Sequence, residues 1–258
     1  MSSQTPAKKF RLDRFISIKA GIAKSDVRLL LAQKRIFVDG HIATDVSQPI
    51  DQFSHVILDD QVLQNNTRRY YMLNKPVGVV SATKDDQHTT VMDLFKEEDT
   101  ADLHIVGRLD LNSSGLLLLT NDGDWSRALM SPENKVSKVY EVTLENPITQ
   151  DYIQAFAEGM YFSYEDITTK PAQLEILSEH VARVTLEEGR YHQIKRMFGR
   201  FRNPVLALHR VSIGEIKLDE DLAPGEYRWL RKSEVNPKDF LLNPLTNFTK
   251  KREISSKR

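Results

Sequence analysis

The sequence predicts an α+β protein in which a small N-terminal domain precedes a larger domain built on a mixed, mainly antiparallel sheet. Strand-like and helix-like segments follow one another without the regular alternation of parallel α/β folds. The 258 residues, of which 40% are hydrophobic, are enough for two such domains with packed cores. A polar connector at residues 64–67 indicates the boundary between the domains.

The composition and the missing motifs exclude several classes of protein. The chain has no cysteine, which excludes disulfides, thiolate zinc sites and cysteine nucleophiles. No segment has the pattern of a signal peptide or the length of a membrane span, so we expect a soluble, cytoplasmic protein without a membrane partner. A Gly-x-Gly-x-x-Gly turn, a phosphate-loop lysine and zincin histidine spacing are also missing. We therefore expect no cofactor and no metal.

The charged residues are segregated along a chain whose formal net charge is zero. Residues 1–35 carry nine lysines and arginines against two aspartates, whereas residues 36–67 carry five aspartates and no lysine or arginine. Residues 189–213 carry six lysines and arginines and no acid. Two basic surfaces on a neutral protein favour a nucleic-acid partner. The alternative is that both are ordinary solvated helix faces.

Residues 10–44 predict two helices followed by a hairpin, after a polar and mobile start at residues 1–9. We expect Gly21 to end the first helix and Ser25 to cap the second. The apolar residues spaced for inner helix faces are Leu12, Phe15, Ile16, Val27, Leu30 and Leu31. The basic residues expected outside are Lys24, Arg28, Lys34 and Arg35. The hairpin covers residues 35–44, with its turn at Asp39-Gly40.

The rest of the chain mixes strand and helix patterns, beginning with a strand that completes the first domain. Strand patterns cover residues 56–58, 68–73, 104–106, 116–119, 138–144, 172–177, 180–186, 205–209, 213–218 and 227–230. Helix patterns cover residues 91–95, 123–130, 151–158 and 193–201. We expect Pro76 to end the strand 68–73 before Asn74, and residues 233–258 to form a basic tail.

The stretch Gly107–Gly123 is the strongest candidate for a functional site. Arg108 and Asp110 stand in a polar turn that leads directly into the four leucines 116–119. A leucine run bounded by turn residues predicts a buried strand, which would hold the carboxylate of Asp110 rigidly. A nucleophile or an acid–base group needs such support. The alternative is a structural turn in which Asp110 is only a local cap.

Four ordered motifs of the second domain resemble those of the pseudouridine synthases that act on ribosomal RNA. They are Asn74-Lys75-Pro76 with Gly78, Gly107–Asp110 with Ser114–Leu116, Lys138–Tyr140 and Gly189–Met197. Thr169–Ala172 and Leu222–Tyr227 are more similar to the small-subunit branch than to the large-subunit branch. In the first domain, Arg11–Asp13 and Ile36–Gly40 resemble the alpha-L RNA-binding domain. The resemblance implies an alpha-L domain at residues 1–67, a catalytic domain at residues 68–232 and the tail at 233–258.

The resemblance also implies a reaction, in which a uridine within RNA is isomerised to pseudouridine without a cofactor. Asp110 would be the essential carboxylate, acting covalently or by way of a glycal intermediate, and the sequence leaves both routes open. Tyr140 would stack on the uracil, Lys195 would keep the carboxylate ionised, and Arg108 would fill the space left by the flipped base. Further RNA-binding candidates are Arg196, Arg11, Arg14, Lys24, Arg28, Lys34 and Arg35. The candidates for structural support are Asn74, Lys75, Pro76 and Gly115.

The partner implied by the resemblance is ribosomal RNA, either free or in partly assembled small-subunit particles, and the enzyme would act as a monomer. Three alternatives remain at this point. The chain could be a non-catalytic RNA-binding factor in ribosome assembly, a large-subunit pseudouridine synthase, or a nucleoside hydrolase or glycosylase that uses the same carboxylate. Only the enzymes need Asp110, and only a hydrolase or glycosylase would release free uracil.

Overall fold

The computed structural model describes residues 9–96 and 98–235, which fold into two compact units. One unit contains the described residues up to Arg68 together with Asp122–Asp124, and the other contains the remainder. Residues 1–8 of the predicted mobile start and most of the predicted basic tail lie outside the described residues. Among the described helices, none is both long and apolar enough to cross a membrane.

The first unit packs two short helices against small antiparallel sheets. Its helices are α1 (Leu12–Ala20) and α2 (Lys24–Ala32). A four-stranded sheet has the order β3-β2-β5-β6, with β2 (Ile36–Val38), β3 (His41–Ile42), β5 (Val56–Leu58) and β6 (Gln61–Gln64), while β1 (Phe10–Arg11) pairs with β4 (Pro49–Ile50). All six apolar residues expected on the inner helix faces are buried, which confirms the pattern. Gly21 ends α1 in the left-handed conformation, as expected.

The second helix differs from the prediction at both ends. The extended backbone of Ala23 starts it, so Ser25 lies inside the first turn and its hydroxyl bonds to Asp26 instead of capping the helix. The helix ends at Ala32, which leaves Lys34 and Arg35 in the following turn rather than on the helix face. There Arg35 forms an ion pair with Asp59 at the end of β5. The prediction was wrong because the basic spacing continues past the last helical turn.

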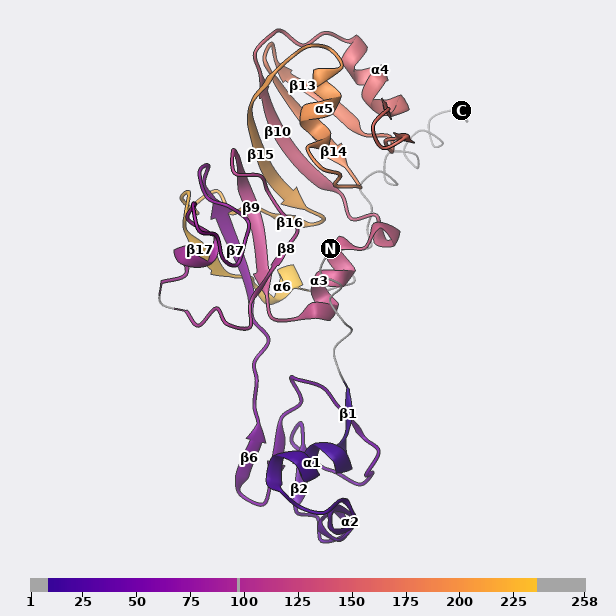
Figure 1. Ribbon diagram of the computed structural model, residues 1–258, viewed down its shortest axis with the longest axis vertical. Helices are drawn as coiled ribbons and strands as arrows, with labels where there is room; N and C mark the ends of the chain where they lie inside the picture. The colour runs from indigo at the N-terminus through magenta and orange to yellow at the C-terminus, as the bar shows by residue number, and fades with distance from the viewer. Residues whose placement is uncertain (1–8, 97, 236–258) are drawn as a thin grey trace, which may run out of the picture. The chain divides into compact units, whose positions relative to one another are not determined.

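The second unit is organised by a nine-stranded mixed sheet, whose main path is β13-β14-β10-β15-β9-β7-β17 (Figure 1). β9 and β15 run parallel, and the other pairings described in this sheet are antiparallel, which confirms the predicted fold class. The strands are β7 (Tyr70–Lys75), β8 (His104–Val106), β9 (Ser113–Thr120), β10 (Lys138–Leu144), β13 (Gln173–Ser178), β14 (Val181–Leu186), β15 (Val205–Ile213), β16 (Ile216–Lys217) and β17 (Tyr227–Trp229).

Helices cover the two faces of this sheet. On one face, α4 (Asp151–Glu158) and α5 (Gln193–Gly199) pack their apolar residues against β10, β13 and β14 (Figure 1). On the other face, Trp125 and Leu129 of α3 (Gly123–Met130) pack against β7 and β9. The smaller elements are the 3-10 turns Met92–Leu94 and Pro132–Asn134, the pair β11 (Tyr161–Phe162) and β12 (Ile167–Thr168), and α6 (Lys232–Val235).

Strand β9 is buried on both faces, as its leucine run predicts. Leu117 and Leu119 belong to the core under α4 and α5, whereas Leu116 and Leu118 belong to the core against α3. All four side chains are fully buried. Neighbouring strands hold β9 on both edges, so the turn at its amino end is attached to a central, fully buried strand of the sheet.

Two strands have other bounds than the sequence pattern predicts: β7 is shifted by two residues, and β15 is longer. β7 continues through Asn74 and Lys75, with Pro76 just beyond its last residue. β15 is one continuous strand from Val205 to Ile213, whereas we expected two strands separated around Arg210. Arg210 lies inside the strand because backbone carbonyls of neighbouring segments accept bonds from its guanidinium. A charged residue can thus stand in a buried strand when its donors are bonded.

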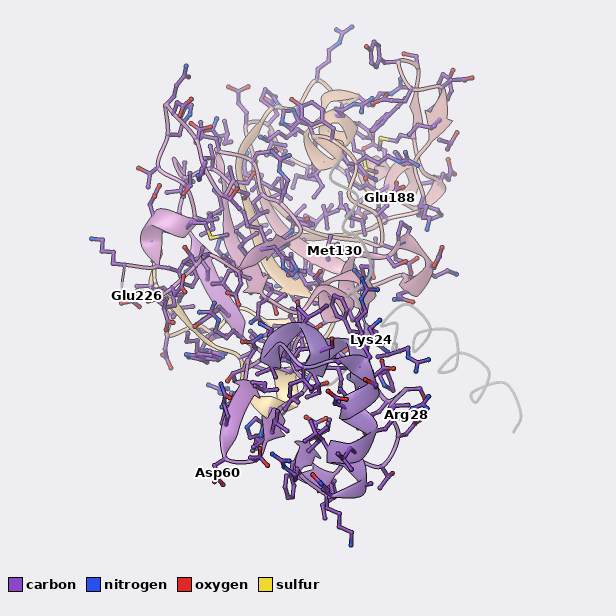
Figure 2. The ribbon with its side chains drawn as sticks, turned by 60° about the horizontal axis from the view of Figure 1, so that its bottom comes forward. Lys24, Arg28, Asp60, Met130, Glu188 and Glu226 are labelled. Atoms are coloured by element: carbon purple, nitrogen blue, oxygen red, sulfur yellow. The ribbon has the colours of Figure 1, made fainter. Side chains whose placement is uncertain are left out.

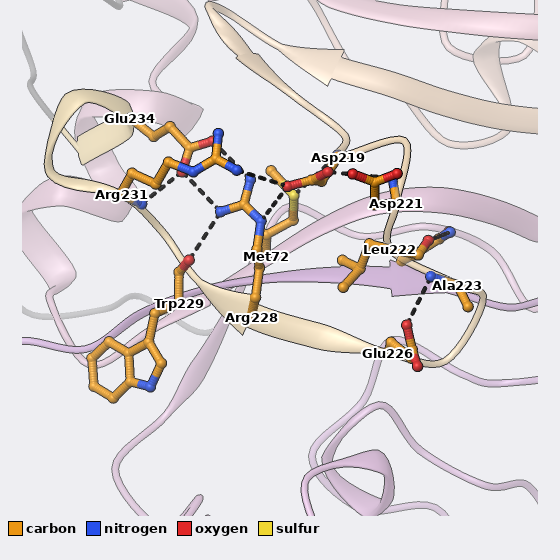
Figure 3. Close-up of polar contacts among 11 residues, drawn as sticks. Met72, Asp219, Asp221, Leu222, Ala223, Glu226, Arg228, Trp229, Arg231 and Glu234 are labelled. Carbon is orange, nitrogen blue, oxygen red and sulfur yellow. Dashed lines mark hydrogen bonds and ion pairs between the residues drawn. The ribbon is translucent and has the colours of Figure 1, made fainter.

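The last described strand, β17, is fixed by a cluster of ion pairs (Figure 3). The guanidinium of Arg228 lies between Asp219 and Glu234, at 2.7 and 2.9 Å from the nearest carboxylate oxygens. Arg231 reaches the same Asp219 oxygen at 3.2 Å. β17 is the edge strand of the sheet and pairs with β7. The ion pairs join it to the loop before it and to α6 after it.

Candidate active site

The turn that carries Asp110 is held through almost every carbonyl of its backbone. The oxygen of Leu109 accepts a bond from the Ser81 hydroxyl at 2.8 Å, and the oxygen of Leu111 accepts the Gly78 amide at 2.9 Å. The oxygen of Asp110 itself accepts the Ser113 amide at 3.0 Å and the Lys75 ammonium at 3.1 Å. A turn with so many fixed groups has little conformational freedom left to lose when a substrate binds.

Two buried cations lie beneath this turn. Lys75 is fully buried, and its ammonium donates to the carbonyls of Pro76, Asp110 and Ser113 at 2.9, 3.1 and 2.7 Å. Arg210 has 2% of its surface exposed and donates from Nε to the carbonyl of Leu116 at 2.8 Å. Its Nη1 reaches the carbonyl of Arg108 at 3.4 Å. Both cations therefore bind the backbone on either side of Asp110 and not its carboxylate.

Arg210 also brings three strands together. It pairs with Tyr140 of β10 on one side and with Gly115 of β9 on the other. Gly115 has a φ of +101°, and a Cβ at this position would lie 2.4 Å from the carbonyl oxygen of Arg210. Only glycine allows this close approach. The Nη2 of Arg210 is buried, and no group of the described residues bonds to it.

Burial changes the titration of two lysines near this turn, Lys75 and Lys138. Burial lowers the pKa of Lys75 to about 8; the charge of Asp110 opposes this shift, and the charge of Arg210 adds to it. Lys138 at the start of β10 is also buried, and burial together with the charge of Arg210 lowers its pKa to about 8. The charge of Arg210 thus lies close enough to both lysines to repel them.

The carboxylate of Asp110 is contacted from the amino end of α5. The Nζ of Lys195 and the Nε2 of His192 both lie 3.3 Å from the same carboxylate oxygen, Oδ2. His192 precedes the helix with a φ of 50°, a left-handed conformation that turns its ring toward Asp110. Within the part of the chain that the structure describes, no hydrogen bond reaches Oδ1 of Asp110. The two carboxylate oxygens are therefore not equivalent.

An open, polar cavity lies over the carboxylate. Asp110, Tyr140, His192 and Lys195 line it together with the apolar side chains of Leu186 and Leu208. The ring of Tyr140 is largely buried, with the guanidinium carbon of Arg210 6.0 Å from its centroid. Arg108 stands exposed at the edge of the cavity. A carboxylate, a cation and an aromatic ring thus face a common space that a planar base could enter.

The structure places the other predicted residues of this unit around the site in different roles. Arg196 points away from Asp110, since its guanidinium pairs with Glu165 and stacks 3.8 Å from the centroid of Phe162. Asn74 is buried and donates to the carbonyl of Leu222 at 2.7 Å. The predicted basic surface of residues 189–213 is smaller than expected, because Arg210 is buried and Arg190 pairs with Glu188.

The basic residues of the first unit also differ in their availability. Arg11 pairs with Asp13, Arg35 pairs with Asp59, and the guanidinium carbon of Arg14 lies 5.9 Å from the centroid of Phe10. For Lys24, Arg28 and Lys34 the structure gives no ion pair with a described residue, and all three are exposed. Figure 2 labels Lys24 and Arg28 along α2, where they form an exposed basic row.

Sequence reasoning misses three residues that shape the site. Arg210 falls within a predicted basic surface, although a single arginine within an otherwise strand-like run is a signal for a buried, bonded cation. His192 stands in one of the four motifs, but its spacing carries no sign of a contact with Asp110. Ser81, which holds Leu109, carries no sequence signal because its role depends on a chain crossing between positions 28 residues apart.

The described residues contain no group of three histidine, aspartate or glutamate side chains arranged to hold a metal ion. The active-site side chains are instead one carboxylate, one ammonium, one imidazole and one phenol. Such a set supports nucleophilic attack, proton transfer and stacking on a base.

Comparisons with known proteins point to one family of enzymes. A model of the family described as RNA pseudouridylate synthase matches residues 69–199. Ribosomal small subunit pseudouridine synthase A of Pseudomonas aeruginosa is 51% identical over 226 residues, which are 87% of this chain and 98% of that protein. The protein of the same name from Escherichia coli K12 is 42% identical over 226 residues, with shares of 87% and 98%. A crystal structure of a pseudouridylate synthase aligns with a TM-score of 0.65 and 40% identity. The alignment covers 90% of this chain and 100% of that chain.

Proposed function

The chain belongs to the RNA pseudouridylate synthase family, and from this premise we propose that it converts a specific uridine of small-subunit ribosomal RNA to pseudouridine. The enzyme is an isomerase of RNA, and the names of its relatives support the small subunit as the source of its substrate. The single observation that carries the catalytic assignment is the carboxylate of Asp110, held between Lys195 and His192 in the cavity that Tyr140 lines.

The reaction we assign to this cavity is an internal rearrangement. The C1'–N1 bond of the uridine breaks, the uracil turns, and a C1'–C5 bond forms. The proton on C5 is then removed and N1 gains a proton, so atoms and charge balance without an outside reactant. Asp110 starts the process either by attacking covalently or by taking a proton from the sugar to give a glycal. Both routes need one free carboxylate oxygen.

The contacts of Asp110 support different roles for its two carboxylate oxygens, one in orientation and one in the reaction. Lys195 and His192 both hold Oδ2, which keeps the carboxylate oriented. We assign the chemistry to Oδ1, the oxygen to which no described residue donates a hydrogen bond. The ammonium of Lys195 places a positive charge 3.3 Å from Oδ2, beside the carboxylate that would attack or accept a proton.

The positions of Tyr140 and Arg108 in the cavity lining support a role in binding a flipped base. The ring of Tyr140 lines the cavity beside Asp110, where it would stack on the uracil, and its hydroxyl is our candidate for moving the C5 proton. Arg108 stands exposed at the edge of the cavity, where its planar guanidinium would occupy the gap that the base leaves in the RNA. Flipping costs a few kcal/mol, which such contacts offset.

We assign the first unit to RNA binding as an alpha-L domain. The support is its exposed basic row, in which Lys24 and Arg28 have no described ion pair. Replacing both by glutamine should weaken RNA binding evenly across sequences and reduce the salt slope by roughly 0.7 to 0.9 per lost phosphate contact. Arg35→Gln is the matched control, because Asp59 already neutralises that guanidinium and a smaller change is expected. An unchanged salt slope in the double variant would contradict the assignment.

The experiment that tests the function is pseudouridine mapping of ribosomal RNA from cells that lack this protein. We expect one small-subunit site to lose its pseudouridine and to regain it when the wild-type chain is returned. Loss of a site in large-subunit RNA instead would support the large-subunit alternative. Unchanged modification in both RNAs would favour the non-catalytic assembly factor.

A further inference from the structure

We propose that Tyr191 and His192 form a stacking platform for an unpaired base of the RNA next to the uridine that enters the cavity. The inference rests on the proposed function, because it needs an RNA substrate with its target uridine at Asp110. The two rings are stacked on each other, with centroids 3.9 Å apart and an interplanar angle of 20°. Tyr191 remains 75% exposed, so an aromatic face is presented to solvent directly beside the reacting group.

The position of the platform fits a neighbouring nucleotide rather than the target. His192 lines the cavity and lies 3.3 Å from Asp110, whereas Tyr191 stands outside the cavity lining. A base stacked on the free face of Tyr191 would therefore lie outside the cavity that the target uridine enters. Aromatic rings accept any base in this way, because every base has a π face, and single-stranded RNA is commonly bound by such stacking.

The loop that carries both rings is fixed in advance. The side-chain oxygen of Gln193 accepts the amide of Arg190 at 3.1 Å, and its amide donates to Glu188 at 2.6 Å. His192 is held in a left-handed conformation, which is unfavourable for a residue other than glycine and is maintained where surrounding contacts require it. This loop thus orders the rings before RNA arrives, which reduces the entropy lost on stacking.

A structural role for Tyr191 makes a different prediction. If its ring only shields His192, removing the ring would lower activity equally on every RNA. If it stacks on a base, the loss would disappear when that base is missing. The two roles are therefore separated by a double-mutant cycle in which one partner is a side chain and the other is a nucleobase.

The experiment measures kcat/KM and RNA affinity of wild type and Tyr191→Ala. The substrates are small-subunit RNA carrying the target uridine and versions with a single abasic nucleotide at each position within two of it. We expect Tyr191→Ala to lose roughly fivefold to a hundredfold on intact RNA and about twofold or less on one abasic RNA. Tyr191→Phe keeps the ring and should stay near wild type on both. Tyr164→Ala, at another exposed tyrosine, is the control and should show no dependence on the missing base.

An equal loss for Tyr191→Ala on intact RNA and on every abasic RNA would overturn the platform, and so would no loss on intact RNA. If the proposed function itself were wrong, the experiment would give a different result. In that case wild type itself would form no pseudouridine on the intact RNA, whatever residue stands at position 191.

Discussion

The floor and the rim of the site contact the same aspartate in different ways. The floor consists of Lys75, Gly115 and Arg210, which are buried and hold or approach the backbone around Asp110. The rim consists of His192 and Lys195, which are partly exposed and contact the carboxylate. The difference teaches that the backbone of Asp110 and its carboxylate are held by separate residues. Substitutions in the floor should therefore affect stability and rate together, and those in the rim should affect rate alone.

The largest expected effect is at Gly115, where the floor leaves no space for a side chain. A Cβ at this position would lie 2.4 Å from the Arg210 carbonyl oxygen, at a φ of +101°. We expect Gly115→Ala to lower the free energy of unfolding by about 4 kcal/mol or more. Gly78→Ala is the matched control, because Gly78 also has a positive φ but no atom of the described residues within 4 Å of a new Cβ. It should lose only about 1 kcal/mol, and equal losses in urea denaturation would contradict the account.

Arg210 is expected to give the next largest effect. Arg210→Met leaves the carbonyls of Arg108 and Leu116 without their donor, which should lower the unfolding free energy by about 2–3 kcal/mol. The misplaced turn should also lower kcat about a hundredfold while RNA affinity stays near wild type. Arg210→Lys keeps the charge, but an ammonium lacks the planar guanidinium that donates to both carbonyls, so the variant should recover only part of the rate.

A control on the same strand separates loss of stability from loss of position. Ile213→Val removes one buried methyl from β15 outside the cavity lining, and should cost about 1 kcal/mol with no change in kcat. If the Ile213 variant lost as much kcat as Arg210→Met, the role of Arg210 in placing Asp110 would be wrong.

Substitutions in the rim should lower the rate with little loss of stability. Lys195→Met removes the ammonium 3.3 Å from Oδ2 of Asp110, and we expect kcat to fall roughly tenfold to a hundredfold. Because the pair is partly exposed, the unfolding free energy should change by only about 0.5 kcal/mol. Lys195→Arg keeps the cation and should recover part of the rate. A loss confined to RNA affinity would show that Lys195 only binds phosphate.

The last expected effect is a dependence of stability on pH that comes from Lys75. Its pKa is about 8 in the folded chain against 10.5 normally, so between these values the unfolded chain holds a proton that the folded chain has lost. Stability from this group therefore rises with pH in that window, by up to about 1.4 kcal/mol per pH unit. We expect the difference in unfolding free energy between wild type and Lys75→Met to increase from pH 8 to pH 10. A constant difference in urea denaturation would contradict it.

Much of the fold was predictable because local patterns decide it. The leucine run 116–119, the alternation at 138–144 and the apolar spacing in the first two helices follow from strand and helix periodicity. The continuous β15 was not predictable from periodicity, because Arg210 interrupts the apolar pattern and is accommodated only by carbonyls from distant segments. The true start of α2 was missed because Ala23 begins the helix without a capping side chain.

The site residues also separate into those that sequence motifs predict and those that depend on contacts between distant segments. Asp110, Tyr140 and Lys195 stand in motifs and were found from the sequence, and the structure brings them to one cavity. In the floor, Lys75 and Gly115 stand in motifs and were named as structural support. Arg210 and the nearby Ser81 were missed, since both act on the turn through backbone groups that carry no residue identity. The stacking of Tyr191 on His192 could not be predicted from the sequence either, because only the structure shows that this ring is exposed and stacked.

The most direct test of the central claim is pseudouridine formation by purified wild type and Asp110→Asn on unmodified small-subunit ribosomal RNA. Asparagine keeps the size of the side chain but can neither attack nor accept a proton as a carboxylate does. We predict that the variant folds, binds RNA with wild-type affinity, and forms pseudouridine slower by about a thousandfold or more. Activity of Asp110→Asn within tenfold of wild type would contradict the account, because the held carboxylate would then not be the reacting group.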